Sequence, residues 1–301
     1  MTDRRAYLLV NLATIIWATN ITLGRALRAD IGPITLTAIR VIVAALVFTW
    51  LLRRQLSWQL FRNLRLLVLM ALTGVVGYQI LLYVALHYTT AANAAIITAV
   101  SPLATLPLAV VMLRNRILPR EILGMLLSLL GVVFIVGFSA ITLGVNLGDT
   151  LSIIDAVVWA FYSVIGRMVM RSRDALGATG AAFLLGVPIV LPLMLIEWMV
   201  LPPVWNPTAL LLAVYIGVFP AAVALLFWNS SIRQLGPART MAFYNTLPLY
   251  TSLLGWAVLH EPLQWTQVVG GALVFAGAML AAWQPTSKAD KLAEPVSSAG
   301  S

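Results

Sequence analysis

The residues of this chain most able to bind another molecule are aromatic and polar side chains that lie inside long apolar runs. In the first run Trp17 and Asn20 lie three residues apart, and Trp159, Tyr162 and Ser163 belong to the matching face of a later run. Indole and phenol rings offer stacking and cation-binding surfaces, while amides and hydroxyls offer hydrogen bonds. This combination predicts a binding site for a small molecule that has apolar and polar parts.

The same two faces also permit a simpler interpretation. Gly24 follows Trp17, and Gly166 follows Trp159, by seven residues, so these faces could serve only for close helix packing. The tryptophans would then be interfacial residues. Each tryptophan lies well inside its run rather than at an end, which favours the binding role.

Other apolar runs carry candidates of the same kind. Tyr78 follows two glycines that permit close approach of another helix, and Asn245 is an amide deep inside a run, where it needs a polar partner. The residues expected to contact a bound molecule are Trp17, Asn20, Tyr78, Tyr83, Trp159, Tyr162, Ser163, Tyr244 and Asn245.

Trp228 and Asn229 lie towards the end of their own run. A role in the binding site and a place in an interfacial aromatic belt fit this position equally well, and the sequence leaves both open.

Charged side chains inside the runs are few, and two of them could take part in coupling. Asp155 is the only acid clearly within a run, and Arg40 lies about a third of the way into another. Acids inside membrane helices often carry protons or face a partner, so Asp155 is the candidate for proton coupling. The alternative is a purely structural ion pair between Asp155 and Arg40 or Arg25.

Two prolines at matching positions are the candidate hinges. Pro102 and Pro248 each lie inside a predicted helix, where a proline frees a backbone carbonyl and allows bending. Inert kinks are the alternative interpretation.

Long apolar runs dominate the chain and decide its class. Of its 301 residues 61% are hydrophobic and 10% are charged, whereas soluble domains carry about a quarter charged residues. A helix needs about 20 apolar residues to cross a bilayer. On that rule the sequence predicts an all-α integral membrane protein with ten transmembrane helices, at 6–27, 33–52, 64–86, 91–113, 120–140, 149–170, 176–198, 208–230, 237–258 and 265–284.

The composition disfavours catalysis and metal binding. The chain has no cysteine and only two histidines, both at the ends of predicted spans. There is no HExxH sequence, glycine-rich phosphate loop or nucleophile elbow. We therefore expect no enzymatic activity, no metal site and no cofactor.

The cations predict the orientation. With the N-terminus inside, the inner segments carry Arg4, Arg5, Arg53, Arg54, Arg62, Arg65, Arg114, Arg116, Arg120, Arg171, Arg173, Arg233, Lys288 and Lys291. Cytoplasmic loops are rich in Lys and Arg, so both termini are expected in the cytoplasm. The net charge of +9 then needs no nucleic-acid partner.

One pattern occurs twice along the chain. An offset of 146 residues relates Pro102 to Pro248, Gly124 to Gly270 and Gly131 to Gly277. Five helices per half is an odd number, so the second half enters the membrane from the opposite side. The sequence therefore predicts two inverted five-helix repeats, at 6–140 and 149–284. The remaining residues, 285–301, are expected to form a disordered cytoplasmic tail.

Several stretches of the chain resemble a known family. They are WATNITLGR, GDTLSIIDAVVWAFYSVIGR, AAIITAVSPLATLPLAVVML and LHEPLQWTQVVGGALVFAGAML. In this order and spacing they resemble the ten-helix EamA-type exporters of the drug/metabolite transporter superfamily, over about residues 6–284. One departure is Asn115, where the family often has Glu. Aromatic content and length resemble the branch that exports amino acids, particularly aromatic ones.

The resemblance and the residues together predict a function. We expect a multi-pass transporter of the bacterial inner membrane that exports small metabolites, aromatic or neutral amino acids above all, by alternating access around a central cavity between the repeats. Its expected partners are the amino-acid substrate and the lipid bilayer, and it is expected to act as a monomer. The alternative is efflux of cationic drugs by proton antiport, for which Asp155 would be essential.

Overall fold

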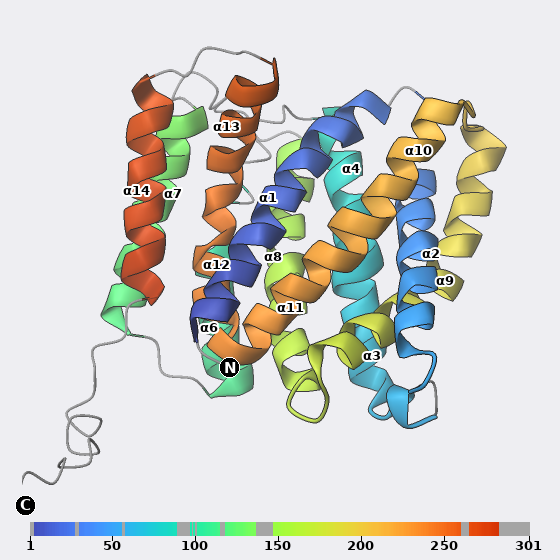
Figure 1. Cartoon of the computed structure of the whole chain (residues 1–301), viewed down its shortest axis with the longest axis horizontal. Helices are drawn as coiled ribbons and strands as arrows, with labels where there is room; N and C mark the ends of the chain where they lie inside the picture. The colour runs from blue at the N-terminus through green and yellow to red at the C-terminus, as the bar shows by residue number, and fades with distance from the viewer. Residues whose placement is uncertain are drawn as a thin grey trace, which may run out of the picture.

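The chain folds into a bundle of helices (Figure 1). The structure is a computed structural model, which describes residues 3–27, 30–55, 58–88, 97, 99, 101–114, 118–136, 147–259 and 265–282. Within these ranges every regular element is helical. The predicted tail at 285–301, and parts of the predicted spans 91–113 and 120–140, lie outside the described residues.

The described part of the first half contains α-helices together with a 3-10 helix, η1, and a π-helical segment, η2. Their bounds are α1 (Asp3–Leu27), α2 (Pro33–Leu52), η1 (Trp58–Phe61), α3 (Leu64–Met70), η2 (Ala71–Gly77), α4 (Tyr78–Tyr88), α6 (Ser101–Leu113) and α7 (Pro119–Val136). Those of the second half are α8 (Leu147–Val169), α9 (Ala175–Val200), α10 (Pro207–Ile216), η4 (Gly217–Val223), α11 (Ala224–Leu235), α12 (Pro237–Ala242), η5 (Tyr244–Thr246), α13 (Leu247–Leu259) and α14 (Trp265–Ala282).

Five stretches of described helix are long and apolar enough to cross a membrane. They are Pro33–Leu52, Leu64–Ala85, Leu147–Val169, Ala175–Val200 and Pro207–Leu235, and they coincide with five of the ten predicted spans. Two further apolar helices, Ser101–Leu113 and Trp265–Ala281, are shorter. The prediction of an all-helical protein with several membrane-spanning helices is therefore confirmed for the described residues.

Two helices contain a π-helical segment in the middle, which the sequence did not reveal. The segment η2 joins α3 to α4, and η4 joins α10 to α11. The offset of 146 residues takes Ala71 to Gly217 and Gly77 to Val223, so the two π segments occupy matching positions. Single-turn π distortions within α-helices are frequent at functional sites.

The candidate hinge prolines lie at the starts of described helices. Pro248 is the second residue of α13, directly after the interruption formed by η5, and Pro102 is the second residue of α6. A proline is well tolerated in the first turn, because the N–H that it lacks has no helical partner there. The expected mid-helix placement is therefore wrong for Pro248, which follows the break at η5; Val100, just before α6, lies outside the described residues, and the hinge role of both prolines stays a prediction.

Helices α7 and α14 lie side by side at one edge of the bundle (Figure 1). A Cβ atom on Gly124 would lie 2.5 Å from the carbonyl oxygen of Gly277, and one on Gly131 would lie 2.5 Å from that of Gly270. Between these pairs the hydroxyl of Ser128 donates to a carbonyl oxygen of α14 at 3.2 Å. Residue numbers rise along one helix as they fall along the other, so the two helices are antiparallel.

Helices α2 and α9 pack together towards the opposite edge. The first turn of α2 has no side-chain cap of its own. Glu197 of α9 supplies one, because its carboxylate accepts from the backbone amides of Ile34 and Thr35 at 2.9 and 2.6 Å. Near the other end of the pair, Arg173 donates to the carbonyl oxygen of Leu60 in η1. Polar groups at both ends therefore fix this helix pair, consistent with the need to satisfy helix termini.

The glycine contacts between α7 and α14 give a test of the fold. Gly124→Ala and Gly277→Ala are each expected to lower the free energy of unfolding by about 1–3 kcal/mol, because the new methyl group meets backbone atoms that cannot move aside. Thermal unfolding of the purified protein in detergent measures the change. Gly166→Ala is the control, since its Cβ would meet no heavy atom nearer than 3.7 Å and it shares the gain in helix propensity. Equal stabilities for the three variants would contradict the packing described.

Candidate functional site

Six aromatic side chains meet in the interior of the bundle, and we refer to them as the aromatic cluster. They are Trp17 of α1, Tyr78 of α4, Trp159 and Tyr162 of α8, Trp228 of α11 and Tyr244 of η5. Trp159 is at the centre, and its ring centroid lies 4.6 to 5.9 Å from those of the other five. These separations are those of attractive aromatic pairs.

A hydrogen bond to the second π segment, η4, fixes the side chain of Trp17 in the cluster. Its indole N–H donates to the carbonyl oxygen of Pro220 in η4 at 3.0 Å. The matching tryptophan of the other half, Trp159, has an indole nitrogen with no hydrogen-bond partner among the described residues. Two tryptophans at matching positions therefore differ in their hydrogen bonding.

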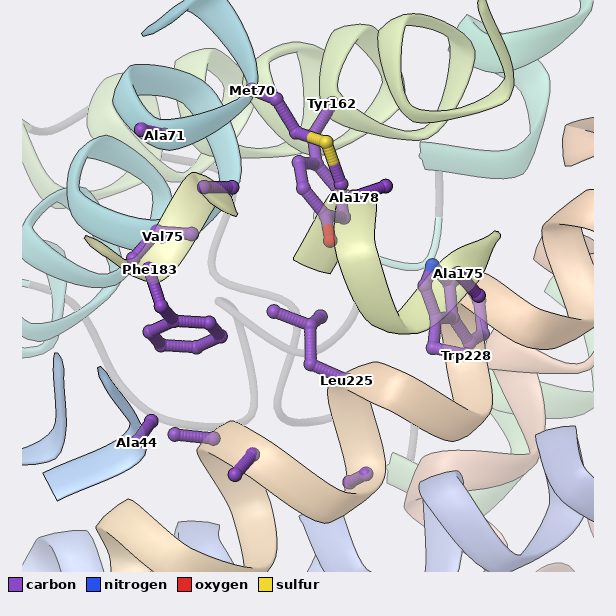
Figure 2. Packing of buried hydrophobic residues seen from close by; sticks show 14 of the residues in the cluster. Ala44, Met70, Ala71, Val75, Tyr162, Ala175, Ala178, Phe183, Leu225 and Trp228 are labelled. Atoms are coloured by element: carbon purple, nitrogen blue, oxygen red, sulfur yellow. The ribbon is translucent and has the colours of Figure 1, made fainter. Parts of the chain in front are cut away.

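The ring of Tyr162 packs against the backbone at Gly74, where any larger residue would clash with it. A Cβ atom on Gly74 of η2 would lie 1.9 Å from a ring carbon of Tyr162. Figure 2 shows the ring of Tyr162 beside Met70 and Ala178, with Trp228 on a neighbouring helix. The first π segment, η2, thus packs against the ring of Tyr162, whereas the second, η4, accepts a hydrogen bond from Trp17.

The side chain of Asn229 in α11 is hydrogen-bonded to side chains of α8 and α9. Its amide nitrogen donates to the hydroxyl of Tyr162 at 2.6 Å and to the hydroxyl of Thr179 in α9 at 2.9 Å. The side chain of Asn229 is fully buried, as is that of its neighbour Trp228. The interpretation of these two residues as an interfacial belt is therefore wrong, and both belong to the interior.

The interrupted helix formed by α12, η5 and α13 brings two polar residues to the cluster. The hydroxyl groups of Tyr244 and Tyr78 are hydrogen-bonded at 2.7 Å. Asn245 is 1% exposed, and neither its amide nitrogen nor its amide oxygen has a hydrogen-bond partner in the described part of the chain. An amide buried without partners is costly, and contact of Asn245 with a ligand stays a prediction.

Asp155 and Arg40 are both buried without forming the ion pair that one interpretation predicted. Asp155 is 0% and Arg40 6% exposed, and neither carboxylate oxygen of Asp155 has a hydrogen-bond partner among the described residues. Nη1 of Arg40 is likewise without one. Both charges lie within electrostatic range of Tyr78. The other suggested partner, Arg25, has a side chain outside the described part.

Three further predicted site residues are not among the six rings. Tyr83 packs in a separate apolar group with Leu27 and Leu36, and its contact with a substrate stays a prediction. Ser163 donates its hydroxyl to the carbonyl oxygen of Trp159 one turn earlier at 3.0 Å, as serines inside helices commonly do. Asn20 is buried but makes no hydrogen bond through its side-chain oxygen to any described residue.

The six rings pack on one another between the two halves, where the sequence predicts a cavity. A groove on the surface between α13 and α14, lined by Leu249, Leu253, Gln267, Val268 and Phe275, shares no residue with the cluster. In the described residues no three His, Cys, Asp or Glu side chains come together as metal ligands.

Known proteins resemble this chain over most of its length. The model of the EamA-like transporter family matches twice, at residues 4–137 and 146–283. The uncharacterized transporter YyaM of Bacillus subtilis is 27% identical over 81% of this chain and 80% of its own. An uncharacterized transporter of Archaeoglobus fulgidus is 27% identical over 92% and 97%. A protein of known crystal structure superposes with a TM-score of 0.77 at 21% identity, covering 97% of this chain and 100% of that one.

The bonds of Asn229 can be tested by a double-mutant cycle. Asn229→Leu is expected to lower the free energy of unfolding by about 1–3 kcal/mol, because it leaves the buried hydroxyl of Tyr162 without a partner. Adding Tyr162→Phe should restore part of this loss, since the orphaned hydroxyl is then removed. Thermal unfolding of the two single variants and the double variant measures the coupling. Losses that simply add would show that the two side chains do not depend on each other.

Proposed function

Because the chain belongs to the EamA-like transporter family, we propose that it exports small metabolites, aromatic and neutral amino acids above all, across the bacterial inner membrane. The observation that carries this proposal is the aromatic cluster, to which helices from both family-matched segments contribute rings. Unpaired charges are buried beside the rings. The named relatives are transporters too, and membrane transport by a multi-pass protein is the shared property.

The chemistry of the site supports a zwitterionic substrate. Its unpaired hydrogen-bond donors are Nη1 of Arg40 and the indole nitrogens of Trp159 and Trp228, which suit a carboxylate. Its unpaired acceptors include the carboxylate of Asp155 and the amide oxygen of Asn245, which suit an ammonium group. The rings supply a stacking wall for an apolar or aromatic side chain. An amino acid presents all three features in one molecule.

The architecture that we propose consists of two inverted five-helix repeats with both termini in the cytoplasm. The two matches to the family model support two repeats, at 4–137 and 146–283. The antiparallel packing of α7 and α14, with glycines of each helix facing those of the other, supports an inverted relation. The matching positions of the π segments η2 and η4 further support the repeat itself. The cations of the inner segments support the orientation.

We propose that one chain transports by alternating access, with the two π segments taking turns as partners of the tryptophans. In the present structure Trp17 donates to Pro220 in η4, while the Trp159 indole is unpaired and Tyr162 covers Gly74 in η2. In the opposite state the indole N–H of Trp159 would donate to a backbone carbonyl oxygen of η2. The hydrogen bond from Trp17 to the carbonyl oxygen of Pro220 would be broken. Inverted repeats exchange conformations in this manner.

Transport into proteoliposomes tests the proposed function. Labelled tryptophan, phenylalanine, methionine and threonine are offered in turn to the purified protein, and saturable counterflow is expected for at least the aromatic ones. Trp17→Ala should reduce this flux by about tenfold or more, because it removes a ring wall of the site. Trp50→Ala is the control, since it removes an indole that is 63% exposed. Movement of a lipophilic cation without any amino-acid flux would refute the proposed substrate.

The exchange of tryptophan contacts gives a second test. Trp17→Phe is expected to lose about 0.5–1.5 kcal/mol from the broken hydrogen bond, in addition to the packing lost with the smaller ring. Trp159→Phe should lose packing only, since that indole nitrogen has no partner among the described residues. Both variants should nevertheless slow transport, because each removes a bond of one state. Normal transport by Trp159→Phe would rule out the exchange.

A further inference from the structure

A buried carboxylate without a partner is the most unusual polar feature of this molecule. Asp155 lies within α8, is 0% exposed, and has no hydrogen-bond partner for either oxygen in the described residues. Ionised or not, such a group is costly inside an apolar bundle. By contrast, Glu197 is satisfied by three donors at 2.6 to 2.9 Å. The described residues thus supply no partner for Asp155, and a ligand is one group that could provide it.

The surroundings of Asp155 are aromatic on two sides. Trp159 follows one turn later on the same face of α8, because residues four apart are neighbours on a helix. The hydroxyl-bonded pair Tyr78 and Tyr244 lies within electrostatic range of the carboxylate. The ring of Tyr78 is also only 4.6 Å from that of Trp159. Aromatic faces beside a carboxylate are the setting in which proteins bind organic ammonium groups.

No cation among the described side chains pairs with Asp155. Arg40 is the buried cation that lies within electrostatic range of Tyr78, yet it makes no hydrogen bond to Asp155, and its own Nη1 has no partner. The ion pair that the described residues do form joins Arg239 to Glu121 at 3.5 Å, away from the aromatic cluster. A cation supplied by the transported molecule would fill the vacant role.

We propose that Asp155 binds the protonated amine of the transported molecule, with the rings of Tyr78, Trp159 and Tyr244 around it. This inference rests on the proposed transport function and narrows it to substrates that carry an ammonium group. A ligand with only a carboxylate brings a like charge to Asp155 and is rejected. Amino acids and simple aromatic amines share the required group, and the experiment below separates them.

A set of indole compounds tests the proposal with the unmodified protein. L-Tryptophan carries ammonium and carboxylate, tryptamine carries only the ammonium, and indole-3-propionate carries only the carboxylate. Binding of labelled L-tryptophan in detergent is measured in competition with the other two. Tryptamine is expected to compete, and indole-3-propionate to be weaker by about tenfold or more. Equal competition by the two would overturn the proposal without any substitution.

Substitutions then identify the carboxylate. Asp155→Asn keeps the shape but not the charge, and it should weaken binding of tryptophan and tryptamine by about 10- to 100-fold. Binding of indole-3-propionate should not fall, and Asp155→Glu should restore part of the amine affinity. Asp30→Asn is the control, because its carboxylate makes no hydrogen bond to any described residue. Unchanged binding of tryptophan by Asp155→Asn would overturn the proposal.

The two proposals fail in different ways. If proteoliposomes move tryptophan and Asp155→Asn moves it equally well, the proposed function stands and the role of Asp155 is refuted. If no amino acid moves but tryptamine binds in a manner that depends on Asp155, the amino-acid substrate is refuted and the ammonium site stands.

Discussion

The structure depends on one constraint, which is that a polar group carried into an apolar bundle must find its partner within the bundle or in a ligand. Most buried polar groups here obey it internally. Glu197 caps α2, Asn229 joins the hydroxyls of Tyr162 and Thr179, and Arg173 holds a carbonyl group of η1. Among the described residues the side chains of Asp155 and Asn245 do not; Asp155 lies one helical turn before Trp159, and Asn245 directly follows Tyr244. Nη1 of Arg40 and the indole nitrogens of Trp159 and Trp228 also lack a partner there, so the unsatisfied polar atoms include several in or beside the cluster.

The rigid and the adaptable parts of the bundle are separate. Helices α7 and α14 pack backbone to backbone through glycines, where small residues favour close helix association. The aromatic cluster instead lies among interrupted helices, since η2, η4 and η5 all border it. Irregular backbone is tolerated at membrane depth where protein covers it. We infer that the glycine-packed pair is the frame and that the interrupted helices move during transport.

Long apolar runs made the helices predictable, but their internal irregularities were not. The span 33–52 coincides with α2, and 149–170 coincides with α8 to within two residues at its start. The π segments left no sign, because hydropathy reports length rather than hydrogen-bond register. The repeat singled out Trp17, Trp159 and Tyr162, whose rings the structure brings together. It missed Trp228, whose position near the end of a run is compatible with either an interface or a core. Tyr83 was predicted beside Tyr78, but different faces of α4 pack against different neighbours, and the two tyrosines belong to separate apolar groups.

The halves of the protein are alike in fold but not in chemistry, and this has a consequence for the transport cycle. The offset of 142 residues that relates Trp17 to Trp159 takes Asp155 back to Ala13 and Tyr162 back to Asn20. Only one half therefore supplies the buried acid. If Asp155 binds the ammonium group, the substrate is anchored to α8 in every state, and access must change through movement of the other walls around it. The wall opposite α8 includes Trp17, whose single bond to Pro220 is easily broken and remade. In the proposed mechanism α1 and η4 would form the moving gate, while α8 would carry the binding site.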